Sequence, residues 1–485
     1  MKQKLNLIFA ALLGALGTGA LIWVLSQPDR TVLVLGCLTA GISVWVFLRR
    51  NRRYGMLDPL AIFCATFAAY NGLILIRVGM QPDVTKTDFP YPTSFGSESY
   101  LQCGALCLVA ASTIAVVSFL LESKRFKLNV PVHQRVGGSS GAYFIAGSVT
   151  YAIGCVLLYS QIQLTGGWSQ LLQTSRADIY QPSSAPVLSL PFAPFILAGL
   201  AFSAYATFEG IGRFRTYLFY GFLTIWIAVK IATGDRRPIL TALICVAAIA
   251  TSFRPGIFRL TWRRAAICVV AYLVFVFFGQ VRWLVPKLLT GTTNAAEAMV
   301  AASGTTDMNQ FQPERTEFAG PFFSLLESTR ERSDPLYGSS YLDSLAVFLP
   351  RFLYGGDKPL SHSREFDEWV RGQYMRGLKT TPGWGYSPVA EAYDNARTLG
   401  VVIVFAAWTL FFIFIAAFRH HGPVGIVLFS VLIPEAVNAN RIDFRVVYTE
   451  SLYLLGAVLF TWFISKSLNS VRRRTNALVL SRSWQ

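Results

Sequence analysis

The chain has 485 residues, of which 53% are hydrophobic and only 14% are charged, whereas a soluble protein carries about 25% charged residues. This composition excludes a soluble globular protein. The formal net charge of +17 does not indicate nucleic-acid binding, because Lys and Arg gather in short loops between apolar runs, without interleaved aromatic residues. We therefore expect an all-α polytopic membrane protein.

Apolar runs of about 20 residues, each long enough to cross a bilayer of about 30 Å, recur along the chain. The first is expected to stay as a helix, because it is longer than the roughly 7–15 apolar residues of a signal peptide. In chain order, the twelve predicted spans are residues 5–26, 31–48, 58–77, 100–121, 141–161, 191–208, 216–233, 238–252, 265–284, 399–418, 422–440 and 446–465.

Basic residues give these spans an orientation. With the N-terminus inside, the clusters at 49–53, 122–135, 213–215 and 252–264 all fall on the cytoplasmic side, as does the tail, in agreement with the positive-inside rule. Both termini are then cytoplasmic.

The predicted spans divide the chain into four parts. Residues 1–284 hold the first nine spans, 285–398 form a large extracytoplasmic loop, 399–465 hold the last three spans, and 466–485 form a basic cytoplasmic tail. Because ordinary connections have about 4–6 residues, this loop is expected to be functional.

Within the loop, two short segments are expected to be helical. Residues 338–353 are apolar but too short to span, and are predicted to lie on the outer membrane surface. Ser387 as N-cap and Pro388 at the first helical position predict a helix that runs into span ten.

Two arginine clusters are predicted on the outer side. Arg236 and Arg237 form the short turn "GDRRP" between spans seven and eight, and Arg441 and Arg445 follow span eleven. The planar guanidinium suits phosphate oxygens, so we expect an anion site. Alternatively, these arginines anchor the membrane edge, and Arg441 pairs with Asp443.

The loop also carries candidate catalytic groups. His362, the only histidine in the loop, follows Arg351 in "LPRFLYGGDKPLSH". It has no second His or Cys at ligand spacing, so no metal site is expected. Glu391 falls in the first turn of the helix predicted after Ser387. The structural interpretations are a solvated histidine and a carboxylate stabilised by the helix dipole.

Residues around Glu391 are candidates for glycan binding. Trp384, Tyr386 and Tyr393 could stack on sugar rings, and Asn395 lies one turn beyond Glu391 on the same face. Aromatic residues also suit the membrane–water interface, and both interpretations remain open.

Three stretches together resemble the bacterial oligosaccharide repeat-unit polymerases, the Wzy-type O-antigen and exopolysaccharide polymerase family. They are "GSSYLDSLAVFLPRFLYGGDKP", "GWGYSPVAEAYDNARTLG" and "NANRIDFRVV". The resemblance covers residues 230–450, and one departure is "NARTLG", where the family more usually has an aromatic residue before the first glycine. The family's motif positions are here Pro350, Arg351, Lys358, Pro359, Ser387, Glu391, Tyr393, Asn395, Gly400 and 441–444.

The resemblance implies a GT-C-like, inverting glycosyltransferase of the bacterial inner membrane. It would join repeat units carried on undecaprenyl pyrophosphate at the periplasmic face, without metal or other cofactor. A chain-length regulator protein would be a partner, and nucleic acid would not.

The resemblance also assigns roles to residues. Arg236, Arg237 and Arg441 would stabilise the leaving pyrophosphate, with Arg445 or Arg351 assisting. Glu391, or as second choice His362, would be the base for the acceptor hydroxyl.

Two other functions stay open. An O-antigen ligase would use similar arginines, and a lipid-linked oligosaccharide flippase or other transporter also has about twelve spans. A transporter is expected to show two similar halves and polar groups at the membrane midplane, and neither is visible in the sequence.

Overall fold

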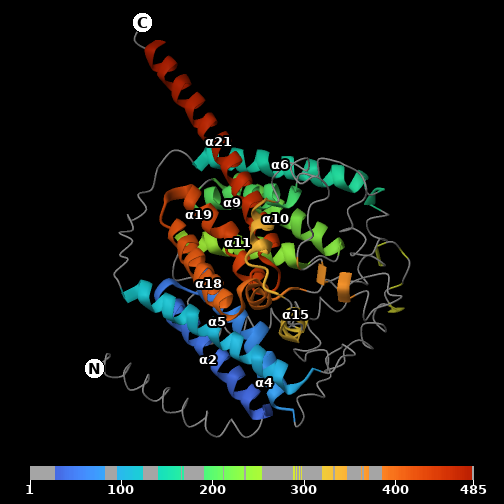
Figure 1. Cartoon of the computed structure of the whole chain (residues 1–485). Helices are drawn as coiled ribbons and strands as arrows, with labels where there is room; N and C mark the ends of the chain where they lie inside the picture. The colour runs from blue at the N-terminus through green and yellow to red at the C-terminus, as the bar shows by residue number, and fades with distance from the viewer. Residues whose placement is uncertain are drawn as a thin grey trace.

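The chain folds as an assembly of helices (Figure 1). The computed structural model describes residues 28–81, 95–123, 140–164, 166–168, 191–210, 212–233, 236–253, 288–289, 291, 294, 296–297, 319–330, 334–346, 362, 365–366, 368–370 and 385–482. Its longer elements are α2 (Pro28–Tyr54), α3 (Pro59–Phe67), η1 (Ala68–Gly72), α4 (Leu73–Gly79), α5 (Ser97–Ser123), α6 (Ser140–Leu164), α9 (Phe192–Phe208), α10 (Arg213–Ala232), α11 (Arg236–Phe253), α15 (Ala319–Arg330), α16 (Ser339–Ala346), α18 (Pro388–Phe418), α19 (Gly422–Leu432), α20 (Glu435–Asn438) and α21 (Phe444–Arg482).

These helices confirm a polytopic membrane protein. In the described part of the chain, seven helical segments are long and apolar enough to cross a membrane, and three shorter apolar helices coincide with further predicted spans. The predicted spans 5–26 and 265–284 lie outside the described residues, so the total of twelve stays a prediction. The predicted tail begins inside α21, which continues as a helix to Arg482.

The helices form two packed groups joined by α19. In the first group, α2 contacts α3, η1, α4 and α5, and α18 packs on α5 and α3. In the second, α6 and α10 pack on α9, while α11 and α21 contact α9 as well. Because α19 contacts α9 and α11 as well as α18, it lies between the groups (Figure 1).

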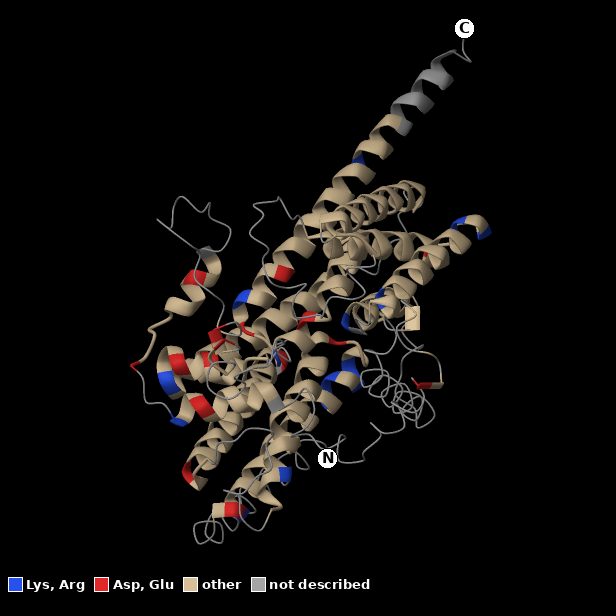
Figure 2. Ribbon diagram, turned by 90° about the vertical axis from the view of Figure 1, so that its right-hand side faces the viewer, with Lys and Arg blue, Asp and Glu red and all other residues tan. Residues whose placement is uncertain are grey.

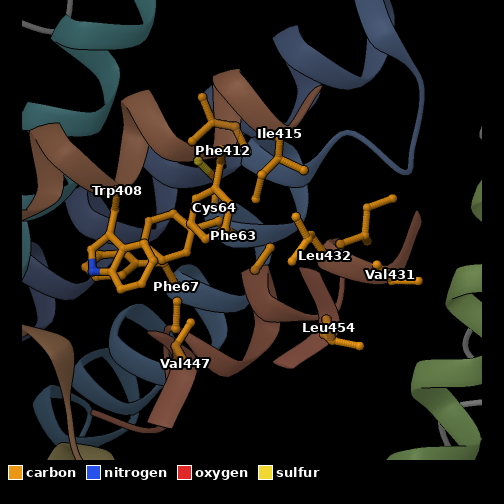
Figure 3. Packing of buried hydrophobic residues seen from close by; sticks show 14 of the residues in the cluster. Phe63, Cys64, Phe67, Trp408, Phe412, Ile415, Val431, Leu432, Val447 and Leu454 are labelled. Carbon is orange, nitrogen blue, oxygen red and sulfur yellow. The ribbon is translucent and has the colours of Figure 1, made fainter. Parts of the chain in front are cut away.

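Aromatic packing holds α18 against α3. The ring centroids of Phe63 and Phe412 are 4.9 Å apart, and Phe67 meets Phe405 edge-on at 5.4 Å. Trp408 stacks on Phe412 at 5.5 Å. Such interdigitated side chains drive helix association where lipid surrounds the protein. Figure 3 shows how the cluster continues through Val431, Leu432, Val447 and Leu454.

Glycine permits the close contact of α6 with α9. A Cβ on Gly147 would lie 2.9 Å from the carbonyl oxygen of Gly199, and a Cβ on Gly199 would lie 2.6 Å from the amide nitrogen of Tyr151. Backbones approach this closely in membranes only where small residues face one another.

One predicted span is interrupted, and so is the helix that leads into another. Residues 422–440 were expected to be one span, but the helix ends at Leu432 and a short helix restarts at Glu435. Pro434, which lacks an amide hydrogen, lies in the break. The helix predicted from Ser387 does run into span ten, but its backbone is non-helical at Ala396 and Arg397.

A buried ion network fixes one end of the first group. Arg50, only 2% exposed at the end of α2, donates to the two carboxylate oxygens of Asp58 at 3.0 and 2.7 Å and to Glu122 at 3.2 Å. Asp58 also caps α3, because its side chain accepts a hydrogen bond from the Ala61 amide. The network therefore ties together α2, α3 and α5.

The same end gathers the ends of α11 and α18. Arg419, directly after α18, donates to the carbonyl oxygens of Tyr54 at 3.3 Å and Thr251 at 2.7 Å. These residues adjoin the basic clusters at 49–53 and 252–264, which the positive-inside rule predicts on one side. In the predicted topology these helix ends lie on the same side of the membrane, as they do here. That this side is cytoplasmic remains a prediction.

Asp58→Ala would remove the carboxylate that binds the buried Arg50 guanidinium through both of its oxygens. We expect the free energy of unfolding to fall by about 3–5 kcal/mol, because removing one member of a buried ion pair leaves an uncompensated charge. The measurement is the melting temperature of the detergent-solubilised chain, followed by tryptophan fluorescence. Asp334→Ala, at an exposed position, is the matched control, and equal melting temperatures for both variants would contradict this account.

Candidate functional site

Most of the predicted site residues lie in the described part of the chain. Arg351 and Trp384 fall outside it, and so does the side chain of Arg236. The remaining residues lie near the starts of α11, α18 and α21, and His362 lies between α16 and α18. They are Arg237, His362, Tyr386, Glu391, Tyr393, Asn395, Arg441 and Arg445.

The first turns of α18 form a separate helical piece before the kink. Ser387 caps it by accepting a hydrogen bond from the Val389 amide at 3.2 Å, with Pro388 at the first position, as predicted. At the kink, Arg397 has a φ of 54°, and a Cβ on Gly400 would overlap the carbonyl oxygen of Ala392. Gly400 therefore lets the helical piece pack back on the span.

A neighbouring loop closes the C-terminal end of this piece. The amides of Leu336 and Tyr337 donate to the carbonyl oxygens of Asp394 and Asn395, each at 2.9 Å. These carbonyls would otherwise lack partners, because the kink removes their helical donors. The loop before α16 is thereby fixed to the site.

Glu391 is buried, with 2% of its surface exposed. Its Oε2 accepts a hydrogen bond of 2.8 Å from the Phe444 amide, and its Oε1 accepts one of 3.4 Å from Ser340 Oγ. Phe444 is the first residue of α21, and Asp443 caps the same helix by accepting from the Val446 amide at 3.1 Å. The carboxylate of Glu391 thus lies at a helix N-terminus, whose dipole favours negative charge.

Asn395 and Tyr393, predicted to bind a glycan, make contacts within the protein. Asn395 Nδ2 donates to Ser340 Oγ and to the carbonyl oxygen of Glu391, both at 2.7 Å. Tyr393 accepts a 2.6 Å hydrogen bond from Gln102 on α5, and the Arg397 guanidinium lies over its ring. The geometry gives both residues a structural role in holding α18 against α16 and α5.

Tyr386 and His362 border a cavity of about 250 Å3 between α15, the 336 loop and the start of α18. Their rings stack with centroids 5.6 Å apart. The Nδ1 of His362 lies 3.4 Å from Glu365 Oε2, whereas its Nε2 is buried without a hydrogen-bond partner. The imidazole ring of His362 lines the cavity.

Asp394 is a cavity residue that the sequence interpretation missed. Its Oδ2 accepts hydrogen bonds from Tyr386 Oη at 2.7 Å and from Ser328 Oγ at 3.0 Å. It stands three residues after Glu391, so helical periodicity would place it near the same face. That spacing was the available signal.

Nearby carboxylates control the protonation of His362. Burial lowers the pKa of its imidazole, but Glu365, through a hydrogen bond, and Glu391 and Asp443, through their charges, raise the pKa above 6.5 overall. Burial and the charge of Asp394 raise the pKa of Tyr386 well above its usual value. Tyr386 is therefore a stable hydrogen-bond donor, while His362 holds a proton more readily than an ordinary histidine.

The predicted arginine clusters are neighbours. Arg237 Nη2 forms an ion pair of 2.8 Å with Glu450 on α21. Asn438, in the corner that carries Arg441, donates to Glu435 Oε2 at 3.1 Å and more weakly to Glu450 at 3.5 Å. The α10–α11 turn thus reaches the corner between α20 and α21.

The cavity side of the site also touches this corner. A Cβ on Gly385 would overlap the carbonyl oxygen of Arg441, so the 385–387 segment packs directly on the backbone of the corner. Figure 2 shows acidic residues concentrated on the left of the view. The carboxylates of Glu435 and Glu450 beside Arg237 were not anticipated, because no local pattern pairs residues so far apart in the sequence.

Across the described residues, no three His, Cys, Asp or Glu side chains are grouped so as to hold a metal ion. The comparisons add no relative: no family model, curated protein or solved structure matches the chain.

Proposed function

We propose that this chain is a GT-C-like glycosyltransferase that joins lipid-linked oligosaccharide repeat units into a polysaccharide. The donor glycan and the acceptor unit are both carried on undecaprenyl pyrophosphate, at the periplasmic face of a bacterial inner membrane. The reaction is inverting and needs no metal cofactor. A chain-length regulator is its expected protein partner.

The hydrogen bond from the Phe444 amide to Glu391 Oε2 carries this proposal. It joins the helical piece with the Ser-Glu-Tyr-Asn pattern to the corner with the Arg-Ile-Asp-Phe pattern. Arg237 meets the same α20–α21 region through Glu450. Two of the stretches that resemble repeat-unit polymerases, and the start of α11 with Arg237, lie far apart in the sequence and are neighbours in space.

The reaction makes one bond and breaks one. The acceptor hydroxyl oxygen attacks the anomeric carbon of the donor glycan, and the bond from that carbon to the phosphate oxygen breaks. The lipid pyrophosphate leaves with the electron pair, and the hydroxyl proton passes to a base. Fixed cations aimed at the pyrophosphate stabilise the charge that develops there.

In this proposal Arg237, Arg441 and Arg445 supply these cations, together with Arg236 and Arg351. Without substrate, Arg237 is paired with Glu450, and their side chains are 34% and 41% exposed. An ion pair at this exposure contributes only about 0–1 kcal/mol. A pyrophosphate can therefore displace Glu450 from Arg237 at small cost.

His362 is the base that we favour, and Glu391 acts on it through its charge. His362 lines the cavity and its buried Nε2 has no hydrogen-bond partner, whereas both carboxylate oxygens of Glu391 accept hydrogen bonds from the protein. When His362 takes the acceptor proton, the negative charge of Glu391 stabilises the imidazolium that forms. This reverses the order expected from the sequence, and Glu391 becomes the second candidate for direct proton transfer.

Arg237→Ala tests the anion site. In a strain deleted for the gene and complemented with each variant, we expect about 100-fold less long-chain polymer, the usual effect of removing one oxyanion-stabilising donor, at an unchanged protein level. Arg237→Lys should fall between Arg237→Ala and wild type, because it keeps the charge but loses the planar fork.

The control is Arg213→Ala, at an exposed position on the opposite end of α10, which should leave chain length unchanged. Normal chains from Arg237→Ala would refute the anion site. Long glycans left on the lipid carrier in the deletion strain would indicate a ligase instead.

A pH profile separates the two candidate bases. If His362 acts as the base, kcat/KM of the purified chain rises with pH through its raised pKa, because only the neutral imidazole accepts a proton, and His362→Gln abolishes this limb. Glu391→Gln keeps an oxygen for the Phe444 amide but removes a charge, so the limb should move to lower pH. If Glu391→Gln is inactive at every pH while His362→Gln keeps a normal profile, Glu391 is the base.

A further inference from the structure

We infer that the cavity beside His362 is a binding subsite for a single sugar ring, and that it accepts neutral or amino sugars and rejects acidic ones. This inference rests on the proposed function, since it names the substrate class of that site. The resemblance in sequence says nothing about the sugar, so the argument depends on the cavity's size, its aromatic wall and its charge.

The volume of the cavity suits one ring. At about 250 Å3 it equals roughly eight water molecules at about 30 Å3 each. It is smaller than the roughly 300–1,000 Å3 pockets that hold drug-sized ligands. A pyranose fits, and a disaccharide would have to extend outside.

One wall of the cavity is aromatic. Trp369 stacks on Phe366 with centroids 5.8 Å apart, Phe366 meets Tyr386 edge-on at 5.6 Å, and Tyr386 stacks on His362. All four line the cavity, and Trp369 is only partly buried. The C–H face of a pyranose is apolar, and the partly exposed ring of Trp369 offers it a surface to pack on.

The polar wall carries carboxylates and hydroxyl groups. Glu327, Glu365 and Asp394 line the cavity together with Ser324 and Ser328, and no Lys or Arg is among its described lining residues. Carboxylate oxygens accept hydrogen bonds from sugar hydroxyls and attract an ammonium group. The cations near this wall pair with its acids from outside: Arg330 lies 3.9 Å from Glu327, and Arg397 interacts with Asp394.

The charge of this wall determines the class of sugar. A uronic acid or another acidic sugar would bring its carboxylate among three acidic side chains, and such like-charge contact opposes binding. Among the described lining residues, His362 is the one group that could offset it, but it already interacts with Glu365, Glu391 and Asp443. The hydroxyl groups of a neutral sugar and the ammonium group of an amino sugar are complementary to these carboxylates.

Binding of monosaccharide probes to the full purified chain in nanodiscs tests this inference. The probes are the methyl glycosides of glucosamine, N-acetylglucosamine and glucuronic acid, and the readouts are saturation-transfer NMR and Trp fluorescence. We expect the first two to bind and the glucuronide to bind at least about tenfold more weakly. Trp369→Ala should abolish binding of all three.

Charge variants make the test specific. Glu365→Gln changes an exposed side chain and should not unfold the protein. It should reduce severalfold the ratio of the affinity for the two glucosamine glycosides to the affinity for the glucuronide. Asp394→Asn should reduce this ratio as well if that variant folds. Glu368→Gln, an exposed neighbour that does not line the cavity, should leave the preference unchanged. Equal or tighter glucuronide binding, no binding of any probe, or binding unaffected by Trp369→Ala would each overturn the inference.

The outcome is separable from that of the proposed function. Polymer formed by a chain that binds no probe, or that prefers the glucuronide, overturns the subsite and leaves the transferase proposal intact. Probe binding with the expected preference by a chain that makes no polymer supports the subsite and counts against the transferase.

Discussion

The candidate site depends on the hydrogen bonds that the buried carboxylate of Glu391 accepts. A charged group shielded from water needs hydrogen-bond donors, and Glu391 finds them in the Phe444 amide at the start of α21 and in Ser340 on α16. These hydrogen bonds bring together the first turns of α18, the start of α21 and α16, which are distant in the chain. The arginine-bearing corner, the cavity wall and the α16 loop are positioned through that one side chain.

The surrounding helices are regular and closely packed away from the site, and interrupted near it. Aromatic packing holds α3 against α18. The Arg50 ion network holds the helices together at the end opposite the site. Near the site, by contrast, α18 kinks at 396–397 and the predicted span eleven breaks at 433–434. Interrupted helices leave backbone polar groups without helical partners, and membrane proteins tolerate such groups where protein or a cavity surrounds them.

Sequence patterns predicted the helices well and the partners of polar residues poorly. Apolar runs located the described spans, and Ser387 with Pro388 located the start of α18, because these signals are local. Span eleven was predicted as one unbroken helix from its high hydropathy, a signal that does not register the helix break at Pro434. The pairing of Arg237 with Glu450 and the cavity position of Asp394 depend on tertiary packing, for which helical periodicity gives a face but no partner.

The most direct test of the central claim uses the purified chain in liposomes. Its substrate is the lipid-linked repeat unit extracted from a strain deleted for the gene, so the sugar need not be known in advance. The account predicts a ladder of longer glycans and release of one lipid pyrophosphate for each unit joined, with inverted configuration at the new linkage. Units that stay single, or that cross the bilayer without being joined, would contradict it.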